Sequence, residues 1–347
     1  MEYFHYQGKE RGLSMQKHPI KLTSGEIAPL WTGYLGDSMA NCVLHYFLRK
    51  VEDEEVRPIL EYALSLTNEH MAFKDKLFRN EDFPIPRAFT GEDVNPDAPR
   101  LFSDTFTLLY LRQMGTGGMT AYGLALASST REDIRAFFNH NLKTAAELYN
   151  KATTLLLEKG LLPRVPHITY PRTAEFVQKE GWLNGLLGDR RTLNAAEITH
   201  LHLNILTNRI GQTLMQAFAQ CVRSKDVIPH IVRGMRIATK HIEVFSSLLR
   251  DDHLPAPETW EAEVTDSVES PFSDKLMLHH TLSLSALGLS NYGAAVAGSM
   301  RRDLATVYIR LAAEVGTYAD DGAELMIRKE WLEKMPGAIE RDALIQA

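Results

Sequence analysis

Apolar residues recur three and four positions apart over two long stretches near the start of the chain. The first stretch runs from Leu22 to Lys50, and the second runs from about Pro58 to Arg79. This spacing places the apolar side chains on one face of an α-helix, so two long helices are predicted. Proline deep inside a helix removes a backbone hydrogen bond, so we expect Pro58 in the first turn of the second helix.

A proline-rich polar segment follows these two helices, with the sequence NEDFPIPRAFTGEDVNPDAPRL. Its prolines and turn-forming residues disfavour both helix and strand, which indicates a long connection. Helical spacing of apolar residues resumes after it, at FSD, and continues to about Ala127. Ser103 or Asp104 can accept hydrogen bonds from the free amides at the start of this third helix.

A fourth helix is predicted from Arg131 to about Lys159, with Thr130 and Asp133 as a capping box at its start. The order is therefore helix, short turn, helix, long crossover, helix, short turn, helix. One long central connection is typical of ferritin-like four-helix bundles, because the chain must travel the full bundle length before its third helix.

The chain then repeats this whole pattern. Residues 22–86 align with residues 193–257, where 14 of 65 positions are identical, and residues 102–138 align with 272–308, where 12 of 37 are identical. Solenoid repeats have periods of about 20–50 residues, whereas this period is far longer. We therefore predict an all-α protein of two tandem ferritin-like four-helix bundles, each up-down-down-up with a long crossover.

The repeat sets the predicted domain boundaries. They are an N-terminal tail 1–21, bundle 1 at 22–165, a linker 166–192, bundle 2 at 193–336 and a C-terminal tail 337–347. The linker carries apolar residues at helical spacing, namely Phe176, Val177, Trp182, Leu183, Leu186 and Leu187. Such side chains favour burial, so we expect a short helix that docks between the bundles.

Composition narrows the classes of partner. The chain is 44% hydrophobic and 24% charged, which is typical of a soluble globular protein, and its net charge is −6. Nucleic acids and anionic membranes call for a basic face, so neither is an expected partner. The sequence shows no signal peptide and no stretch long enough to span a membrane, and we expect a cytoplasmic location with Cys42 and Cys221 as free thiols.

One histidine occurs at the same place in each copy, His70 in the first and His241 in the second. Di-iron proteins of the ferritin-like class carry a glutamate three residues before such a histidine. Thr67 and Ala238 occupy those positions here, so the di-iron signature is absent. His70 and His241 are therefore only weak metal candidates, and no cofactor and no catalytic residue is predicted.

A structural role for the two histidines is the preferred interpretation. Counted from the bundle ends, His70 should lie level with Tyr122, and His241 should lie level with Tyr292. A buried imidazole that hydrogen-bonds to a tyrosine hydroxyl satisfies both groups. We therefore predict the core hydrogen-bonded pairs His70–Tyr122 and His241–Tyr292.

Charged residues recur at one end of each predicted bundle. Glu26 is expected to face Arg79 there, and Glu197 to face Arg250, while the turn between the third and fourth helices adds an arginine and an aspartate. The predicted structural clusters are Glu26, Arg79, Arg131 and Asp133 in bundle 1 and Glu197, Arg250, Arg301 and Asp303 in bundle 2. Partly exposed ion pairs contribute about 0–1 kcal/mol each.

Several stretches carry a resemblance to a known family. They are FVQKEGWLNGLLGDRRTLNAAEITHLHLNI, ATKHIEVFSSLLRDDHLPAP, PFSDKL and SNYGAAVAGSMRRDLA. From Leu22 onward the chain resembles a domain-of-unknown-function family of endospore-forming bacteria, built of tandem ferritin-like bundles and similar in fold to spore coat protein F. The resemblance implies this fold and a link to sporulation or the spore, and it implies no reaction and no catalytic residue.

Three functional hypotheses follow. The leading one is a non-enzymatic structural or interaction protein, which would bind other proteins or a second copy of itself. The second is a metal-binding ferritin-like oxidoreductase or storage protein, which needs carboxylates at the level of the histidines, where the sequence offers few. The third is a helical bundle that binds a small molecule in an apolar cavity lined by aromatic residues such as Trp31, Tyr34 and Phe73.

Overall fold

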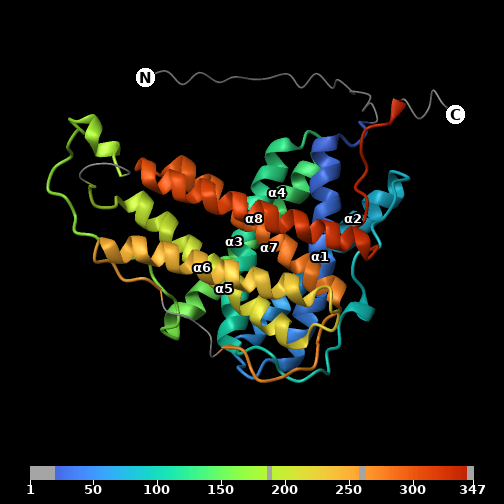
Figure 1. Cartoon of the computed structure of the whole chain (residues 1–347). Helices are drawn as coiled ribbons and strands as arrows, with labels where there is room; N and C mark the ends of the chain where they lie inside the picture. Colours follow the sequence, from blue (N-terminus) through green and yellow to red (C-terminus); the bar gives the residue numbers. More distant parts are fainter. Residues whose placement is uncertain (1–19, 186–189, 258–262, 342–347) are drawn as a thin grey trace, which may run out of the picture.

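The computed structural model of the protein describes residues 20–185, 190–257 and 263–341. Within these residues the chain forms eight α-helices, two short 3-10 helices and no extended β-strand (Figure 1). No helix in this part of the chain is long and apolar enough to cross a membrane. The α-helices are α1 Ser24–Lys50, α2 Arg57–Asn80, α3 Asp104–Ser128, α4 Glu132–Glu158, α5 Ala195–Cys221, α6 Ile228–Asp251, α7 Asp274–Gly298 and α8 Arg302–Arg328.

Helices α1–α4 form bundle 1 and helices α5–α8 form bundle 2. Figure 1 shows the helices of bundle 2 running across those of bundle 1. In each bundle a long crossover joins the second helix to the third, and it contains the 3-10 helix Gly91–Asp93 in bundle 1. The predicted all-α class and the two four-helix bundles with long crossovers are confirmed.

Local sequence signals explain where the helices begin. Pro58 and Pro229 lie in the first turns of α2 and α6, where a missing N–H costs no helical hydrogen bond. Ser103 caps α3, since its side chain accepts a hydrogen bond from the backbone of Phe106 at 3.0 Å. Ser273 caps α7 in the same way. These signals are local, which is why the sequence predicts the helix boundaries well.

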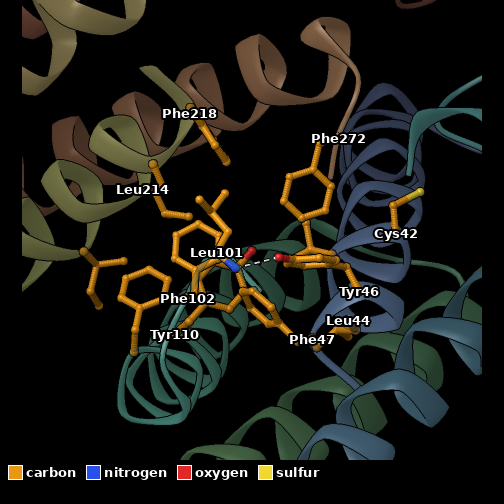
Figure 2. Close-up of a cluster of buried hydrophobic side chains, with 14 of the residues drawn as sticks. Cys42, Leu44, Tyr46, Phe47, Leu101, Phe102, Tyr110, Leu214, Phe218 and Phe272 are labelled. Carbon is orange, nitrogen blue, oxygen red and sulfur yellow. Dashed lines mark hydrogen bonds between the residues drawn. The ribbon is translucent and has the colours of Figure 1, made fainter. Parts of the chain in front are cut away.

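A single core of buried side chains joins the two bundles (Figure 2). The ring of Tyr46 on α1 lies edge-to-face with that of Phe272, which precedes α7, at a centroid distance of 5.3 Å. Phe272 also packs on Phe218 of α5. The hydroxyl of Tyr46 accepts a hydrogen bond from Leu101 N at 2.8 Å and donates one to Pro99 O at 2.7 Å. The bundles therefore share apolar burial, which is the largest stabilising contribution that their contact can make.

The two crossovers pair with each other beside this core. Val94 and Phe272 form one antiparallel bridge, and Phe102 and Val264 form the other. Val94 is the repeat equivalent of Val264, and Phe102 is the repeat equivalent of Phe272. The two contacts are thus related by a pseudo-two-fold axis, so the chain is an internal pseudo-dimer.

The linker between the bundles is docked only at its C-terminal end. There Arg191 donates to Glu197 on α5 at 2.7 Å and accepts at its backbone from Arg301 at 2.9 Å. The ring of Trp182, in the 3-10 helix Glu180–Leu183, has its centre 3.7 Å from the Arg191 guanidinium. By contrast, Phe176 is 96% exposed and Val177 is 58% exposed, so the expected docking does not extend to them. Leu186 and Leu187, which were part of the same prediction, lie outside the described residues.

Replacing Phe176 with serine should therefore change the free energy of unfolding by less than about 0.5 kcal/mol, because the side chain makes little contact with the protein. Trp182→Ala is the matched variant in the docked end, and it should cost about 1 kcal/mol through the lost cation–π contact and packing. Urea denaturation measures both. A loss above about 1 kcal/mol in Phe176→Ser would mean that this part of the linker is packed against a bundle.

Candidate functional site

Each bundle has a buried polar centre around its repeated histidine. His70 lies on α2 and His241 on α6, and both side chains are buried. Tyr122 on α3 and Tyr292 on α7 lie beside them, with ring centroids 5.6 and 5.8 Å from the imidazoles. These two centres contain the histidines that the sequence offers as weak metal candidates.

The centre of bundle 1 contains an aspartate and a lysine as well. His70 Nδ1 lies 3.3 Å from Asp37 Oδ1 on α1 and 3.3 Å from Tyr122 Oη. The other carboxylate oxygen of Asp37 accepts from the ammonium group of Lys74, which is fully buried. A carboxylate can only accept hydrogen bonds, so Nδ1 of His70 carries the proton that it shares with Asp37.

Charge pairing explains how these groups remain buried. Burial would raise the pKa of the Asp37 carboxyl, but the charge of Lys74 and the hydrogen bonds from His70 and Lys74 outweigh it, and the pKa is lowered. Burial raises the pKa of Tyr122 well above its ordinary value, and the negative charge of Asp37 adds to that effect. The centre is therefore an ion pair of Asp37 and Lys74 beside a neutral tyrosine. His70 Nε2, on the other side of the ring, is buried and has no hydrogen-bond partner among the described residues.

Sequence reasoning missed Asp37 and Lys74. The sequence suggests few carboxylates at the histidine level, yet Asp37 lies there in bundle 1. A signal for Lys74 was present, because it follows His70 by four residues and so lies on the same helix face. Gly33 makes room for it, since a Cβ at that position would lie 2.9 Å from Lys74 Nζ.

The centre of bundle 2 is a directed chain of hydrogen bonds. Asn208 Nδ2 donates to Tyr292 Oη at 2.9 Å, and Tyr292 Oη lies 2.8 Å from His241 Nδ1. On the other side of the ring, His241 Nε2 lies 3.0 Å from Glu314 Oε2, and Lys240 donates to Glu314. Because Glu314 accepts only, Nε2 carries the ring proton and Nδ1 accepts from the tyrosine hydroxyl. Both imidazole nitrogens are therefore engaged by protein groups.

The surroundings keep this imidazole neutral. Burial lowers the pKa of His241, and the hydrogen bond and charge of Glu314 offset only part of that effect. The cavity that borders Tyr292 has a volume of about 60 Å³, and the one beside His70 has about 50 Å³. Both volumes are several times smaller than those of typical small-molecule sites, about 300–1,000 Å³.

A second polar feature, the end cluster of bundle 1, is organised by Glu26. Its Oε1 accepts from the backbone amides of Thr130 and Arg131 at 2.9 and 2.8 Å, and its Oε2 accepts from Thr23 N at 2.8 Å. Burial would raise the pKa of Glu26, but these backbone hydrogen bonds lower it to about 2. The start of α4 is thus capped from α1, and the predicted capping box of Thr130 and Asp133 is not formed.

The arginine of this cluster takes carboxylate partners on two sides. Arg131 donates to Asp133 at 2.7 and 2.9 Å, and it donates to Glu81 at 2.5 Å. Asp133 also accepts from the backbone of Ile134. The structure therefore brings Glu26, Arg131 and Asp133 together at one end of bundle 1.

The matching end of bundle 2 is more deeply buried. Arg191 donates to both oxygens of Glu197, at 2.7 and 2.8 Å. Arg301 is fully buried, and it donates to Asp303 at 2.8 and 3.0 Å and to the backbone of Arg191 at 2.9 Å. Its own backbone amide donates to Glu197 at 3.0 Å. Arg191 lies in the linker, outside the repeated segments, so the repeat could not predict its place in this cluster.

The predicted pairings of Arg79 and Arg250 are corrected by the structure. Arg79 donates to Asp75 on its own helix at 2.8 Å rather than to Glu26. Arg250 likewise donates to Glu243 on α6 at 2.5 Å rather than to Glu197. Both arginines therefore lie outside the end clusters.

The remaining candidates offer little chemistry. In residues 20–185, 190–257 and 263–341, no three His, Cys, Asp or Glu side chains are grouped so that they could hold a metal ion. Cys42 and Cys221 are buried free thiols, and burial raises the pKa of both to about 11.

The aromatic residues expected around an apolar cavity pack on other rings instead. Trp31 lies edge-to-face with Phe83, and Tyr34 lies beside Phe78. Phe73 stacks on Phe137 at a centroid distance of 4.0 Å. Trp31 is buried, and Tyr34 and Phe73 are partly buried against the core of bundle 1.

Comparison with known proteins places the chain in a family. The family model described as "Protein of unknown function (DUF3231)" matches residues 10–173 and again residues 182–344. The chain is also similar to a solved structure, that of a "putative spore coat protein" from Bacillus halodurans, with 19% sequence identity and a TM-score of 0.39. The match covers 44% of this chain and 98% of the other chain. No curated protein matches the chain. The predicted resemblance to a tandem-repeat family of unknown function is confirmed, and the chain belongs to the DUF3231 family.

Proposed function

We propose that this protein is a non-enzymatic structural or interaction protein. Each repeated histidine stabilises the interior of its own bundle. The observation that carries the proposal is the closed hydrogen-bond chain of bundle 2, in which both nitrogens of His241 are engaged by Tyr292 and Glu314. A general acid or a metal ligand needs a ring nitrogen that faces a substrate or an ion. The small volumes of the adjoining cavities support the same role.

The partners we propose are other proteins or a second copy of the chain, in the cytoplasm or the spore. Tyr170 and Phe176 support an interaction role, because they leave the linker with aromatic side chains that are 80% and 96% exposed. Aromatic residues are enriched at protein interfaces. The link to the spore follows from the family resemblance of the sequence alone.

The stability of His241→Ala tests the structural role of this histidine. The substitution removes the acceptor of the buried Tyr292 hydroxyl and opens a cavity, whereas Glu314 keeps its ion pair with Lys240. The free energy of unfolding should therefore fall by about 2–4 kcal/mol. Urea denaturation measures the change. His140→Ala is the control, because His140 is half exposed and pairs with Glu69 at the surface, and it should cost less than about 1 kcal/mol.

The opposite result would point to function. Active-site residues are often held at a cost to stability, so their replacement is frequently neutral or stabilising. Unchanged or increased stability in His241→Ala would therefore contradict the structural role.

A further inference from the structure

A cleft of about 300 Å³ lies at the junction of the two bundles. Bundle 1 contributes Arg112 and Gln113 from α3 and Tyr149 from α4. Bundle 2 contributes His200 and Asn204 from α5 and Asn291 from α7. Its volume is at the lower end of the range of small-molecule sites, about 300–1,000 Å³, and the junction of two domains is a common place for such sites.

Three buried polar atoms without a hydrogen-bond partner among the described residues belong to side chains that line this cleft: two donors, on Arg112 and Gln113, and one acceptor, Asn204 Oδ1. The guanidinium of Arg112 lies 4.9 Å from the centre of the Tyr149 ring, and its Nη2 donates to Tyr149 Oη at 3.0 Å. Arg112 Nε and Gln113 Nε2 are buried and have no hydrogen-bond partner in the described part of the chain. Buried donors are nearly always paired, so these two are suited to an acceptor from outside the protein.

The charge of the cleft favours an anion. Arg112 makes no ion pair with the carboxylates of the described residues, and none of the residues that line the cleft is acidic. The apolar part of the lining comes from Met119, Leu203, Leu206 and Ala294. The cleft thus combines one permanent positive charge with an apolar wall.

The internal repeat shows that bundle packing does not require these polar residues. In chain order, the repeat equivalents of Arg112, Gln113, Tyr149, His200, Asn204 and Asn291 are Leu282, Ser283, Ala319, Pro29, Gly33 and Ala121. Five of the six polar residues are replaced by residues whose side chains form no hydrogen bonds, in a copy with the same helices. The polar set is therefore a property of this one cleft.

We propose that the cleft binds a small organic monocarboxylate. Two carboxylate oxygens can accept from Arg112 Nε and Gln113 Nε2, and hydrogen bonds of this charged kind are about twice as strong as neutral ones. A hydrocarbon ring or chain then packs on Met119 and Leu203. This binding site adds a ligand to the structural role and does not depend on the histidine centres.

Isothermal titration calorimetry of the full chain with benzoate and hexanoate tests the proposal, with benzamide and inorganic phosphate as comparison ligands. Both carboxylates should bind, and benzamide and phosphate should bind at least about tenfold more weakly. Arg112→Gln should weaken benzoate binding about tenfold or more, and Gln113→Leu should weaken it less. Arg135→Gln, an exposed arginine on α4 outside the cleft, should leave binding unchanged.

The thermal unfolding of each variant identifies any that fails to fold, and Gln113→Leu keeps the test informative if Arg112→Gln is one of them. No heat of binding at millimolar carboxylate would overturn the proposal. Equal binding of benzoate and benzamide, tighter binding of phosphate, or undiminished binding in both cleft variants would also overturn it.

Discussion

Replacing Asp37 with asparagine should lower the free energy of unfolding by about 3–5 kcal/mol. The carboxylate of Asp37 is the partner of the Lys74 ammonium group, which is fully buried in bundle 1. Without the carboxylate, Lys74 must either remain charged in a region of low polarity or lose its proton, and both are costly. Urea denaturation of the variant measures the loss.

A double variant separates the cost of an unpaired charge from the net value of the pair. Asp37→Asn with Lys74→Met removes both charges, and it should recover much of the stability, because buried ion pairs are often no better than apolar side chains of similar size. Bundle 2 already holds Asn208 and Phe245 at these two positions. Asp75→Asn is the control, because it breaks the surface pair with Arg79 and should cost at most about 1 kcal/mol. A loss of that small size in Asp37→Asn would contradict the buried ion pair.

Acidification below pH 6.5 should destabilise the protein, with His280 as a main contributor. His280 is buried at the junction of the bundles, where its Nε2 lies 3.2 Å from Tyr110 Oη. Tyr110 occupies the position in bundle 1 that His280 occupies in bundle 2. Burial, with a smaller effect from His279, lowers the pKa of His280 from 6.5 to about 3. The group therefore binds a proton in the unfolded chain before it does so in the folded protein.

The sign and size of the effect follow from proton linkage. Because the pKa is lowered on folding, the stabilisation is fully present above pH 6.5 and is lost as the pH falls toward 3. Each pH unit is worth about 1.4 kcal/mol, so His280 alone should cost about 2–3 kcal/mol at pH 4.5. Burial and the charge of Arg233 lower the pKa of His230 to about 4. His230 should therefore add to the loss of stability.

Equilibrium unfolding in urea between pH 7 and pH 4.5 measures this dependence. The slope of the free energy of unfolding against pH gives the number of protons taken up on unfolding. His280→Gln should reduce this number by nearly one. His45→Gln, at an exposed position on α1, is the matched control and should leave the slope as it is in the unaltered protein. A stability that is independent of pH across this range would show that the junction admits water to His280.

Helix positions could be predicted because their causes are local. Apolar spacing, Pro58 in a first turn and Ser103 as a cap each act within a few residues, and the helices begin and end within about two residues of their predicted bounds. The internal repeat then predicted a second bundle with the same order of helices. Partners across helices were harder to predict, because they depend on the rotation and register of each helix.

The polar centres illustrate this difference. Glu314 pairs with His241, yet its repeat equivalent is Thr144, and the carboxylate of bundle 1 comes from Asp37 on another helix. One buried histidine and one tyrosine are kept in both copies while the charges around them differ. A pattern search for carboxylates at fixed spacing along a helix could therefore find neither set.

The junction of the bundles was also beyond sequence reasoning. The prolines and polar residues of the crossovers predicted loops, and in the structure the two crossovers pair with each other through Val94, Phe102 and their repeat equivalents. Only the three-dimensional packing shows that Leu101 and Phe102 of the first crossover join Tyr46 and Phe272 in the core between the bundles (Figure 2).

Elemental mass spectrometry of the purified protein tests most directly whether the histidine centres are structural. The protein is incubated in air with iron, manganese and zinc and then desalted thoroughly. We expect metal at background level for two reasons. Tyr292 and Glu314 engage both nitrogens of His241, and no three His, Cys, Asp or Glu side chains of the described residues are grouped as a metal site in either bundle. A content of about one or two metal ions per bundle, lost in His70→Ala or His241→Ala, would contradict the structural role and indicate a metal centre.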